Sequence, residues 1–272
     1  MQPQDLLLRV TDLKVHLRVG DSVIRAVDGV DLTVAAGECV GIVGESGSGK
    51  STLARAVSRL LPNVALAELS GQALFRGVDT LKMSSADLRA LRRNSGFSMI
   101  FQDPLGYLNP TMRVGKQIRE ALCDKPAAGT DTDRVHALLR EVGLADAAQV
   151  ARRFPHELSG GMRQRVMIAI ALAGEPLLLF ADEPTTALDA TVQLQVLETL
   201  KRVHAERNMA MVIITHDLGV VAALCDRVYV MNGGKVVETA ETVQLFEHPQ
   251  HAYSAQLIAH SRREARVVEA VQ

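Results

Sequence analysis

A glycine-rich segment carries the clearest chemical signal in the sequence. Gly44-Glu45-Ser46-Gly47-Ser48-Gly49-Lys50-Ser51 matches the pattern G-x-x-x-x-G-K-[ST], which cradles the phosphates of a nucleoside triphosphate. The glycines let backbone N–H groups converge on phosphate oxygens at a helix N-terminus, whose partial positive charge favours an anion. We expect Lys50 to contact the β- and γ-phosphates and Ser51 to bind Mg²⁺. Taken alone, the motif predicts a triphosphate site and no particular reaction.

Two carboxylates follow an apolar run later in the chain. The run Leu177 to Ala181 predicts a buried strand, and Asp182 and Glu183 come directly after it. A strand that ends beside a phosphate loop places Asp182 where it can hold Mg²⁺ and Glu183 where it can act on an attacking water. An isolated Asp-Glu pair at a strand end is more typical of a solvated turn, so the order of motifs along the chain decides its meaning.

Two kinds of strand are expected to position these residues. Residues 1–36 alternate apolar and polar side chains in short stretches, which is typical of antiparallel strands. The apolar run Cys39 to Val43 leads into the phosphate loop, and Ser51 to Leu61 has helical spacing. Two further runs, Leu177 to Ala181 and Met211 to Ile214, are continuously apolar, as in parallel strands covered by helices on both faces. The sequence therefore predicts an α/β fold with a mainly parallel sheet.

The rest of the chain is expected to be largely helical between these strands. Helical periodicity dominates from about residue 86 to 174, which we interpret as an inserted α-helical subdomain. Asn232-Gly233-Gly234 between two apolar runs predicts a hairpin. We expect one domain over residues 6–258 and a short C-terminal tail over 259–272. A crossover helix is predicted from the regular spacing of Val192, Val196, Leu200 and Val203.

Composition narrows the class of protein. The chain has 272 residues, 47% of them hydrophobic, and a net charge of −1, which excludes a disordered chain and gives no electrostatic case for nucleic acid as a partner. No apolar run approaches the roughly 20 residues of a membrane-spanning helix, and the start lacks a secretory signal. Because Cys39, Cys123 and Cys225 are widely separated, we expect buried, reduced thiols rather than disulfides or a zinc site.

Further motifs follow in a fixed order. The chain contains Phe101-Gln102-Asp103-Pro104, Leu158-Ser159-Gly160-Gly161-Met162, the acidic pair, Ala187-Leu188-Asp189 and Ile214-Thr215-His216-Asp217. Over about residues 6–258 this set strongly resembles the nucleotide-binding subunit of an ATP-binding cassette (ABC) transporter. Its most specific element is Leu-Ser-Gly-Gly followed by Arg163-Gln164-Arg165. The resemblance implies a P-loop ATPase core with a mainly parallel sheet, an N-terminal antiparallel β subdomain and an inserted α-helical subdomain.

The resemblance also implies roles for single residues. ATP and Mg²⁺ would be the cofactors, and the working unit would be a dimer in which Ser159, Gly160 and Gly161 of one subunit face the γ-phosphate bound by the other. Glu183 would be the general base, with His216 and Gln102 as the other catalytic residues. Ser51, Gln102 and Asp182 would hold the metal. The expected nucleotide-binding residues are Gly44, Glu45, Ser46, Gly47, Ser48, Gly49, Lys50, Ser51, Thr52, Ile24, Ser159, Gly160, Gly161 and Asp189.

Details favour one branch of this family. The sequences around the motifs, including Met162, resemble importers of dipeptides, oligopeptides and nickel, as does His248-Pro249-Gln250-His251-Ala252-Tyr253. For the two histidines we favour packing or capping over metal binding. Members of the branch often continue into a cysteine-containing extension proposed to hold an iron–sulfur cluster, and since no cysteine follows this element, we predict no cluster. The family stacks adenine on an aromatic residue, whereas Ile24 occupies that place here, so we expect weaker ATP binding and poor discrimination against GTP.

The resemblance implies partners and leaves alternatives open. The expected partners are two transmembrane permease subunits, an extracytoplasmic substrate-binding protein and a second ATPase, which is more often a related chain than a second copy. These partners would place this chain at the cytoplasmic face of the inner membrane. Permeases would contact a groove beside Gln102, roughly residues 103–119. The alternatives are a soluble ABC-type ATPase acting on nucleic acid or ribosomes, a regulatory module without turnover, and export instead of import. The cargo is not determined by this sequence.

Overall fold

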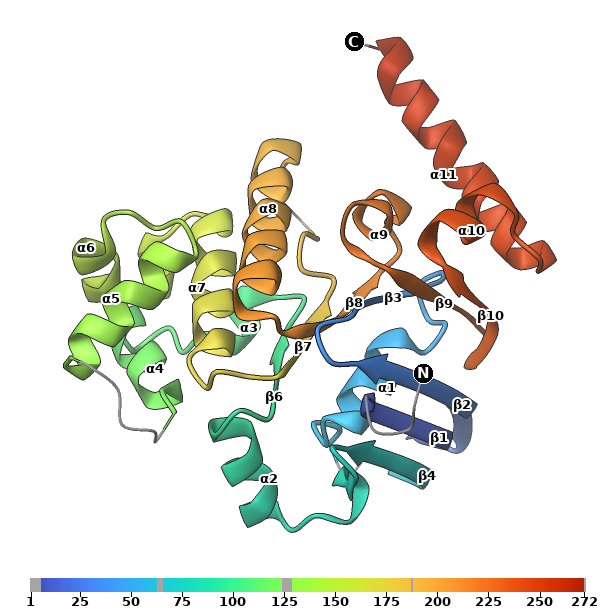
Figure 1. The fold of residues 1–272 in the computed structure, drawn as a ribbon, viewed down its shortest axis with the longest axis horizontal. Coiled ribbons are helices and arrows are strands. Elements are labelled where there is room, and N and C mark those ends of the chain that lie inside the picture. Colours follow the sequence, from blue (N-terminus) through green and yellow to red (C-terminus); the bar gives the residue numbers. More distant parts are fainter. Residues whose placement is uncertain (1–5, 63–65, 124–128, 187, 272) are drawn as a thin grey trace. The chain divides into compact units, whose positions relative to one another are not determined.

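The computed structural model describes residues 6–62, 66–123, 129–186 and 188–271, with only the backbone of 263–271, and the chain divides into two compact units. Met1–Lys82 and Val212–Gln272 form the first unit, and Met83–Met211 the second (Figure 1). Within the described part of the chain, no helix combines the length and the apolar character needed to cross a bilayer.

An antiparallel sheet forms part of the first unit. Its order is β2-β1-β4-β5, and a short 3-10 turn, Thr80–Lys82, follows it. The N-terminal stretches that the alternation predicts as separate strands form one long strand, β1. Inside it Asp12 adopts a positive φ of 44°, at the point where the pairing register shifts. This β-bulge separates the two alternating runs without ending the strand. The four strands are β1 (Leu6–Val19), β2 (Ser22–Ala35), β4 (Leu66–Phe75) and β5 (Val78–Asp79).

Strands of a second sheet, including β8 from Val212 onward, complete the first unit. They lie in the order β10-β9-β3-β8, with β3 parallel to β9 and β9 antiparallel to β10, which confirms the predicted hairpin. Every residue of β3 and of β8 is buried, as the continuous apolar runs predict. The strands are β3 (Cys39–Val43), β8 (Ala210–Thr215), β9 (Arg227–Asn232) and β10 (Lys235–Glu241).

Four helices accompany these strands, and one of them is shorter than predicted. The helix after the phosphate loop ends at Val57 instead of Leu61, because Ser58 caps it and Arg59 takes a left-handed φ of 52°. The C-terminal helix crosses the predicted boundary at residues 258 and 259 without a break. The helices are α1 (Lys50–Val57), α9 (Leu218–Leu224), α10 (Thr242–Glu247) and α11 (Ala252–Val271).

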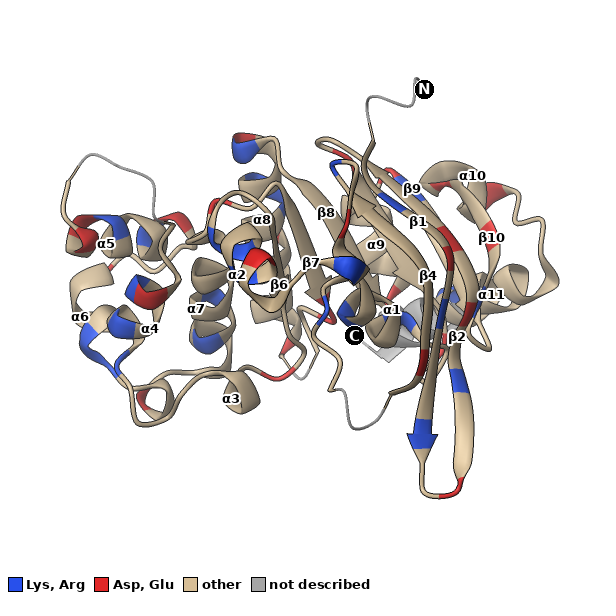
Figure 2. Ribbon diagram, turned by 90° about the horizontal axis from the view of Figure 1, so that it is seen from below, with Lys and Arg blue, Asp and Glu red and all other residues tan. Residues whose placement is uncertain are grey.

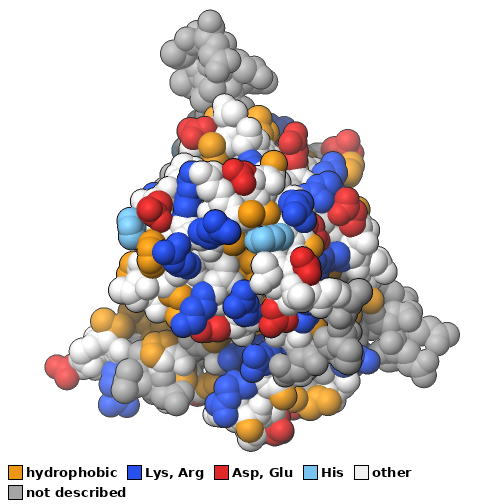
Figure 3. Space-filling model, turned by 90° about the vertical axis from the view of Figure 1, so that its left-hand side faces the viewer, with side chains coloured by type: hydrophobic (Ala, Val, Ile, Leu, Met, Phe, Trp, Pro, Cys, Tyr) orange, Lys and Arg blue, Asp and Glu red, His pale blue; other side chains and the backbone are white. Residues whose placement is uncertain are grey.

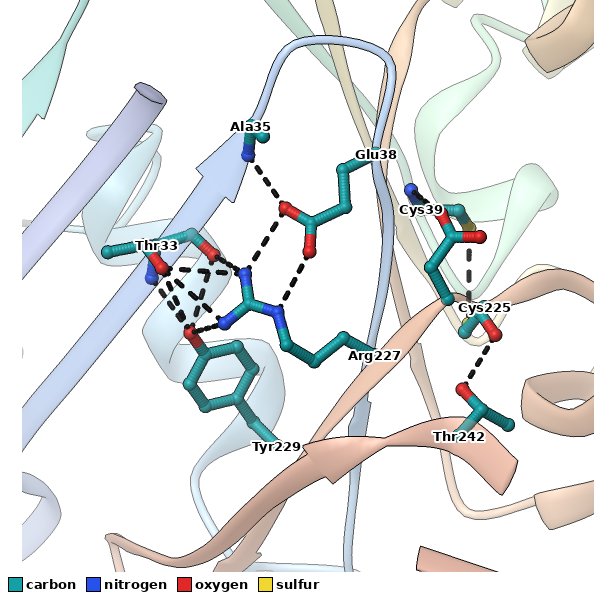
Figure 4. A network of polar contacts seen from close by, with 9 residues as sticks. Thr33, Ala35, Glu38, Cys39, Cys225, Arg227, Tyr229 and Thr242 are labelled. Atoms are coloured by element: carbon teal, nitrogen blue, oxygen red, sulfur yellow. Dashed lines mark hydrogen bonds and ion pairs between the residues drawn. The ribbon is translucent and has the colours of Figure 1, made fainter. Parts of the chain in front are cut away.

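A polar network joins β2 to β9 inside the first unit (Figure 4). The Arg227 guanidinium donates to the Glu38 carboxylate, with Nε 2.8 Å from Oε1, to the Thr33 carbonyl at 2.9 Å and to the Tyr229 hydroxyl at 2.6 Å. Glu38 also accepts from the Ala35 N–H at 2.7 Å. The network therefore fixes the turn that leads into β3 and the phosphate loop.

The second unit combines a helical cluster with two parallel strands, β6 and β7. The strand β6 lies inside the segment 86–174 that we interpret as a helical insertion; its four residues are too few to show a periodicity that separates strand from helix. The crossover helix is confirmed as α8. The elements are α2 (Ser85–Arg93), β6 (Phe97–Ile100), α3 (Pro104–Tyr107), α4 (Val114–Ala121), α5 (Asp131–Glu141), α6 (Ala147–Arg152), a 3-10 turn (Pro155–Glu157), α7 (Gly160–Leu172), β7 (Leu178–Asp182) and α8 (Ala190–Arg207).

Candidate functional site

The phosphate loop connects β3 to α1 in the first unit, in the strand, loop and helix context that the motif requires. The Lys50 ammonium folds back into the loop, where Nζ lies 2.8 Å from the Gly44 carbonyl oxygen and 2.8 Å from that of Glu45. Lys50 is buried, whereas Glu45, Ser46 and Gly47 are exposed. The loop therefore presents exposed backbone around a cation that is already oriented.

Two glycines of the loop are required by close backbone contacts. A Cβ on Gly44 would lie 2.1 Å from the Met231 carbonyl oxygen, and a Cβ on Gly49 would lie 2.0 Å from that of Ala26. Both glycines also have positive φ angles, of 152° and 101°. At Gly47, in contrast, a Cβ would meet no atom within 4 Å. Two of the loop glycines thus serve packing against β2 and β9, and the third leaves open space for a ligand.

The other predicted residues of the first unit are accessible. The Ile24 side chain on β2 is 51% exposed, so its apolar surface is free to meet a planar ligand. His216 is exposed directly after β8, in a turn held by two hydrogen bonds. The Asp217 N–H donates to the Thr215 hydroxyl at 2.9 Å, and the Asp217 carboxylate accepts from the Gly219 N–H at 2.7 Å. Asp217 thereby caps α9 and holds the backbone beside His216.

In the second unit the structure brings two predicted catalytic residues together. The Gln102 amide nitrogen lies 2.9 Å from Oε2 of Glu183, and the Thr186 hydroxyl donates to the same oxygen at 2.8 Å. Glu183 has a left-handed φ of 47°, which is uncommon for a residue other than glycine and is often found at functional sites. Asp182, the last residue of β7, is completely buried. Thr186 is a site residue that the sequence motifs do not predict, although its position three residues after Glu183 in a tight turn allows this contact.

The serine-glycine motif opens α7 as predicted. The Ser159 hydroxyl accepts a hydrogen bond from the Met162 N–H at 3.3 Å and caps the helix. A Cβ on Gly161 would lie 2.3 Å from a methyl carbon of Val192, so this glycine lets α7 approach α8 closely. Asp189 caps α8 by accepting from the Val192 N–H at 3.0 Å. Close packing of α7 on α8 therefore explains why position 161 is a glycine. The capping hydrogen bond gives Asp189 a structural role.

Several recesses lie on the described part of the second unit, including one beside Gln102 and one lined by basic side chains without a carboxylate. The first, of about 340 Å³, lies between Gln102, the first turn of α7 and the turn that ends at Leu188. The second, of about 320 Å³, is lined from α4, α5 and α6 by Arg113, Lys116, Arg119, Arg152 and other residues, with no carboxylate among its described lining residues. Basic segments are visible on α4 and α6 in Figure 2, and Figure 3 shows Lys and Arg side chains gathered over this end of the unit. We call the second cavity the basic recess.

The three cysteines are all buried and free, as predicted. Among the described residues, no group of three or more His, Cys, Asp or Glu side chains could hold a metal ion. His251 instead uses Nδ1 to accept a hydrogen bond from the Tyr253 N–H at 3.1 Å at the start of α11. His251 therefore makes a capping contact at the start of α11.

Comparisons with known proteins agree with these motifs. Residues 27–186 match the family model described as ABC transporter. The oligopeptide transport ATP-binding protein OppD of Salmonella typhimurium is 45% identical over 262 residues, which cover 94% of this chain and 76% of that protein. The peptidoglycan transport ATP-binding protein YejF of Agrobacterium fabrum is 48% identical over 255 residues, and this chain spans 46% of its length.

Solved structures share the fold. The ATP-binding cassette MJ0796, in a dimeric post-hydrolysis state bound to ADP and Pi, has a TM-score of 0.76 and 28% identity, covering 86% of this chain and 98% of that one. The cbiO1 protein of Clostridium perfringens has a TM-score of 0.73 and 26% identity, covering 97% and 99% of the two chains. The motif order, the fold and the match over more than half of the sequence lead to one conclusion: this chain belongs to the ABC transporter family, as one of its ATP-binding proteins.

Proposed function

We propose that this chain hydrolyses ATP to drive the import of peptides or related small solutes, including nickel or metal–chelator complexes. The observation that carries the proposal is the contact of Gln102 and Thr186 with one oxygen of Glu183. Both donors hold the carboxylate in one orientation, and a carboxylate held in this way suits the role of a general base toward water. Relatives named as oligopeptide and dipeptide transport ATP-binding proteins support the class of cargo.

The described residues suit ATP and Mg²⁺. Ser51, Gln102 and Asp182 would supply hydroxyl, amide and carboxylate oxygens, the hard donors that Mg²⁺ prefers. When bound, the metal would neutralise charge on the phosphates. Lys50 and the loop N–H groups would hold the phosphate chain, Glu183 would take the proton of the attacking water, and His216 would donate a hydrogen bond to the γ-phosphate. Ile24 would pack on the base.

A second cassette would complete the site. Ser159, Gly160 and Gly161 lie at the N-terminus of α7, where backbone N–H groups and the helix dipole favour an anion. In the proposed dimer this helix end meets the γ-phosphate held by the other subunit, and Asp189 bridges the contact. The dimeric state of MJ0796 supports a dimer. As the partner subunit we favour a related ATPase over a second copy of this chain.

The permease contact is proposed for the second unit, around residues 103–119. Leu105 and Tyr107 on α3 are 56% and 51% exposed, and Leu105 also lines the recess beside Gln102. Apolar side chains exposed next to a recess are typical of a protein–protein contact. Two permeases, served by an extracytoplasmic binding protein, would hold the chain peripherally at the cytoplasmic face of the membrane. Gln102 would then connect this contact to Glu183.

The variant Glu183→Gln tests the catalytic proposal. It should bind ATP and dimerise in its presence, measured by light scattering, while phosphate release falls by about 10² to 10⁴-fold. The matched control is Glu206→Gln, an exposed carboxylate on α8, which should hydrolyse at the wild-type rate. Turnover of Glu183→Gln near the wild-type rate would refute the assignment.

For the cargo, ATP-dependent uptake of a labelled oligopeptide is compared with uptake of nickel in vesicles that hold the cognate permeases.

A further inference from the structure

Tyr253 contacts the phosphate loop. It is the last residue of the element at residues 248–253, to which the proposed function gives no role. Its hydroxyl oxygen accepts a hydrogen bond from the backbone N–H of Glu45, with the nitrogen 3.0 Å from the oxygen. Tyr253 is the second residue of α11, and both residues belong to the first unit. The C-terminal helix therefore contacts the motif that is expected to hold the phosphates.

The same peptide group contacts Lys50 on its other side. The N–H that Tyr253 accepts belongs to the peptide between Gly44 and Glu45, and the carbonyl of that peptide is the Gly44 oxygen, which lies 2.8 Å from Nζ of Lys50. One planar peptide thus connects the phenol to the ammonium group. Because a peptide group is rigid, the orientation of its N–H sets the direction of its carbonyl and so the position of Lys50. Hydrogen bonds in such a chain also strengthen one another.

Tyr253 is itself held in place by a contact between β10 and the start of α11. The Glu238 carboxylate accepts hydrogen bonds from the N–H groups of Gln250, at 2.7 Å, and His251, at 3.0 Å. Burial alone would raise the pKa of Glu238, but its polar surroundings, the Gln250 N–H foremost, outweigh burial and lower the pKa below its ordinary value. The charged carboxylate therefore anchors the turn from which α11 and Tyr253 start.

We propose that Tyr253 is a positioning residue for Lys50, acting through the Gly44–Glu45 peptide, and that the attachment of α11 thereby sets the affinity for ATP. The inference rests on the proposed binding of ATP at this loop. Since Lys50 is expected to contact only the β- and γ-phosphates, the effect should depend on the nucleotide. Loss of the phenol hydroxyl should weaken ATP binding and leave AMP binding unchanged.

The test compares Tyr253→Phe with the wild-type chain. The variant keeps the ring and removes only the hydroxyl. One hydrogen bond of ordinary strength corresponds to a rise in the dissociation constant of ATP of about 3- to 10-fold. The dissociation constant of AMP should stay constant, and kcat at saturating ATP should remain within about twofold of wild type. Hydrogen exchange should become faster at the N–H groups of residues 44–48 and stay unchanged in β3.

Two further variants separate this role from a general loss of stability. Glu238→Gln, which weakens the anchor but keeps Tyr253, should also raise the dissociation constant of ATP and not that of AMP. Tyr229→Phe removes a hydroxyl from the Arg227 network and should lower the melting temperature without changing either constant. Equal ATP affinity and equal exchange in wild type, Tyr253→Phe and Glu238→Gln would overturn the inference. A wild-type chain that binds ATP without hydrolysing it would count against the proposed function alone.

Discussion

The Gln102 amide donates to the same oxygen of Glu183 that accepts from Thr186, at 2.9 and 2.8 Å. Gln102 lies two residues after the end of β6, whereas Glu183 and Thr186 belong to the turn after β7. Because β6 and β7 are neighbouring parallel strands, their carboxyl ends meet at one edge and bring these side chains together. The orientation of the carboxylate is thus a property of the sheet, which leads to the first prediction.

Thr186→Val should slow ATP hydrolysis by about tenfold, because Glu183 loses a hydrogen bond that orients its carboxylate. ATP affinity should not change, since the Thr186 hydroxyl contacts the Glu183 carboxylate, which is proposed to act on water and not to hold the nucleotide. Steady-state phosphate release and a separate ATP titration measure the two effects. The matched control is Thr11→Val, on the exposed side of β1, which should leave both unchanged. A wild-type rate in Thr186→Val would show that the hydroxyl does not orient the base.

Replacing two loop glycines by alanine should have unequal effects. Gly49→Ala should lower the free energy of unfolding by at least about 2 kcal/mol and weaken ATP binding more than tenfold, because the new Cβ overlaps the Ala26 carbonyl and the φ angle is strained. Gly47→Ala also has a strained φ, but its new Cβ would meet no atom within 4 Å. Its free energy of unfolding should therefore fall by only about 1 kcal/mol. Urea unfolding with and without ATP measures both. Equal losses in the two variants would contradict the role of the Ala26 contact.

Arg227→Met should destabilise the first unit. Breaking a fully buried ion pair costs about 3–5 kcal/mol, and the partial exposure of Arg227 and Glu38, at 18% and 16%, reduces the expected loss to about 2 kcal/mol. Lys14→Met, which breaks the exposed pair with Asp12, is the matched control and should cost less than about 0.5 kcal/mol. Thermal unfolding measures both variants. If both variants had the same melting temperature, the network would contribute no more to stability than an exposed ion pair does.

The thiols of Cys39 and Cys225 should resist alkylation in the folded protein. Their sulfur atoms lie 3.9 Å apart, and the hydrogen bond to Cys225 together with burial raises the pKa of the Cys39 thiol above its ordinary value. The Cys39 thiol therefore stays protonated at about pH 8, where an ordinary thiol begins to form the reactive thiolate. Mass spectrometry after iodoacetamide treatment should find no label on either residue without urea and label on both with it. Rapid labelling of Cys39 in the native protein would contradict its burial.

Local patterns in the sequence were sufficient for much of the fold and the candidate site. The runs from Cys39 to Val43 and from Met211 to Ile214 lie in buried strands, the spacing from Val192 to Val203 lies in α8, and Asn232-Gly233-Gly234 forms the hairpin turn. Each of these predictions depends on residues a few positions apart, whose side-chain directions follow from the period of a helix or strand. The motif residues could be named for the same reason.

The tertiary structure alone decided which distant groups meet. Tyr253 accepts from the Glu45 N–H across 208 positions of sequence, and Arg227 meets Glu38 across 189. Neither contact has a local pattern, because each depends on strand register and on where a helix begins after a turn. Strand β6 escaped prediction because its four residues are too short to show a period. The sequence by itself determined the chemical groups of the phosphate loop and the acidic pair. Packing between distant segments decided how those groups are oriented, since only a folded chain restricts a side chain to a fixed set of hydrogen-bonding partners.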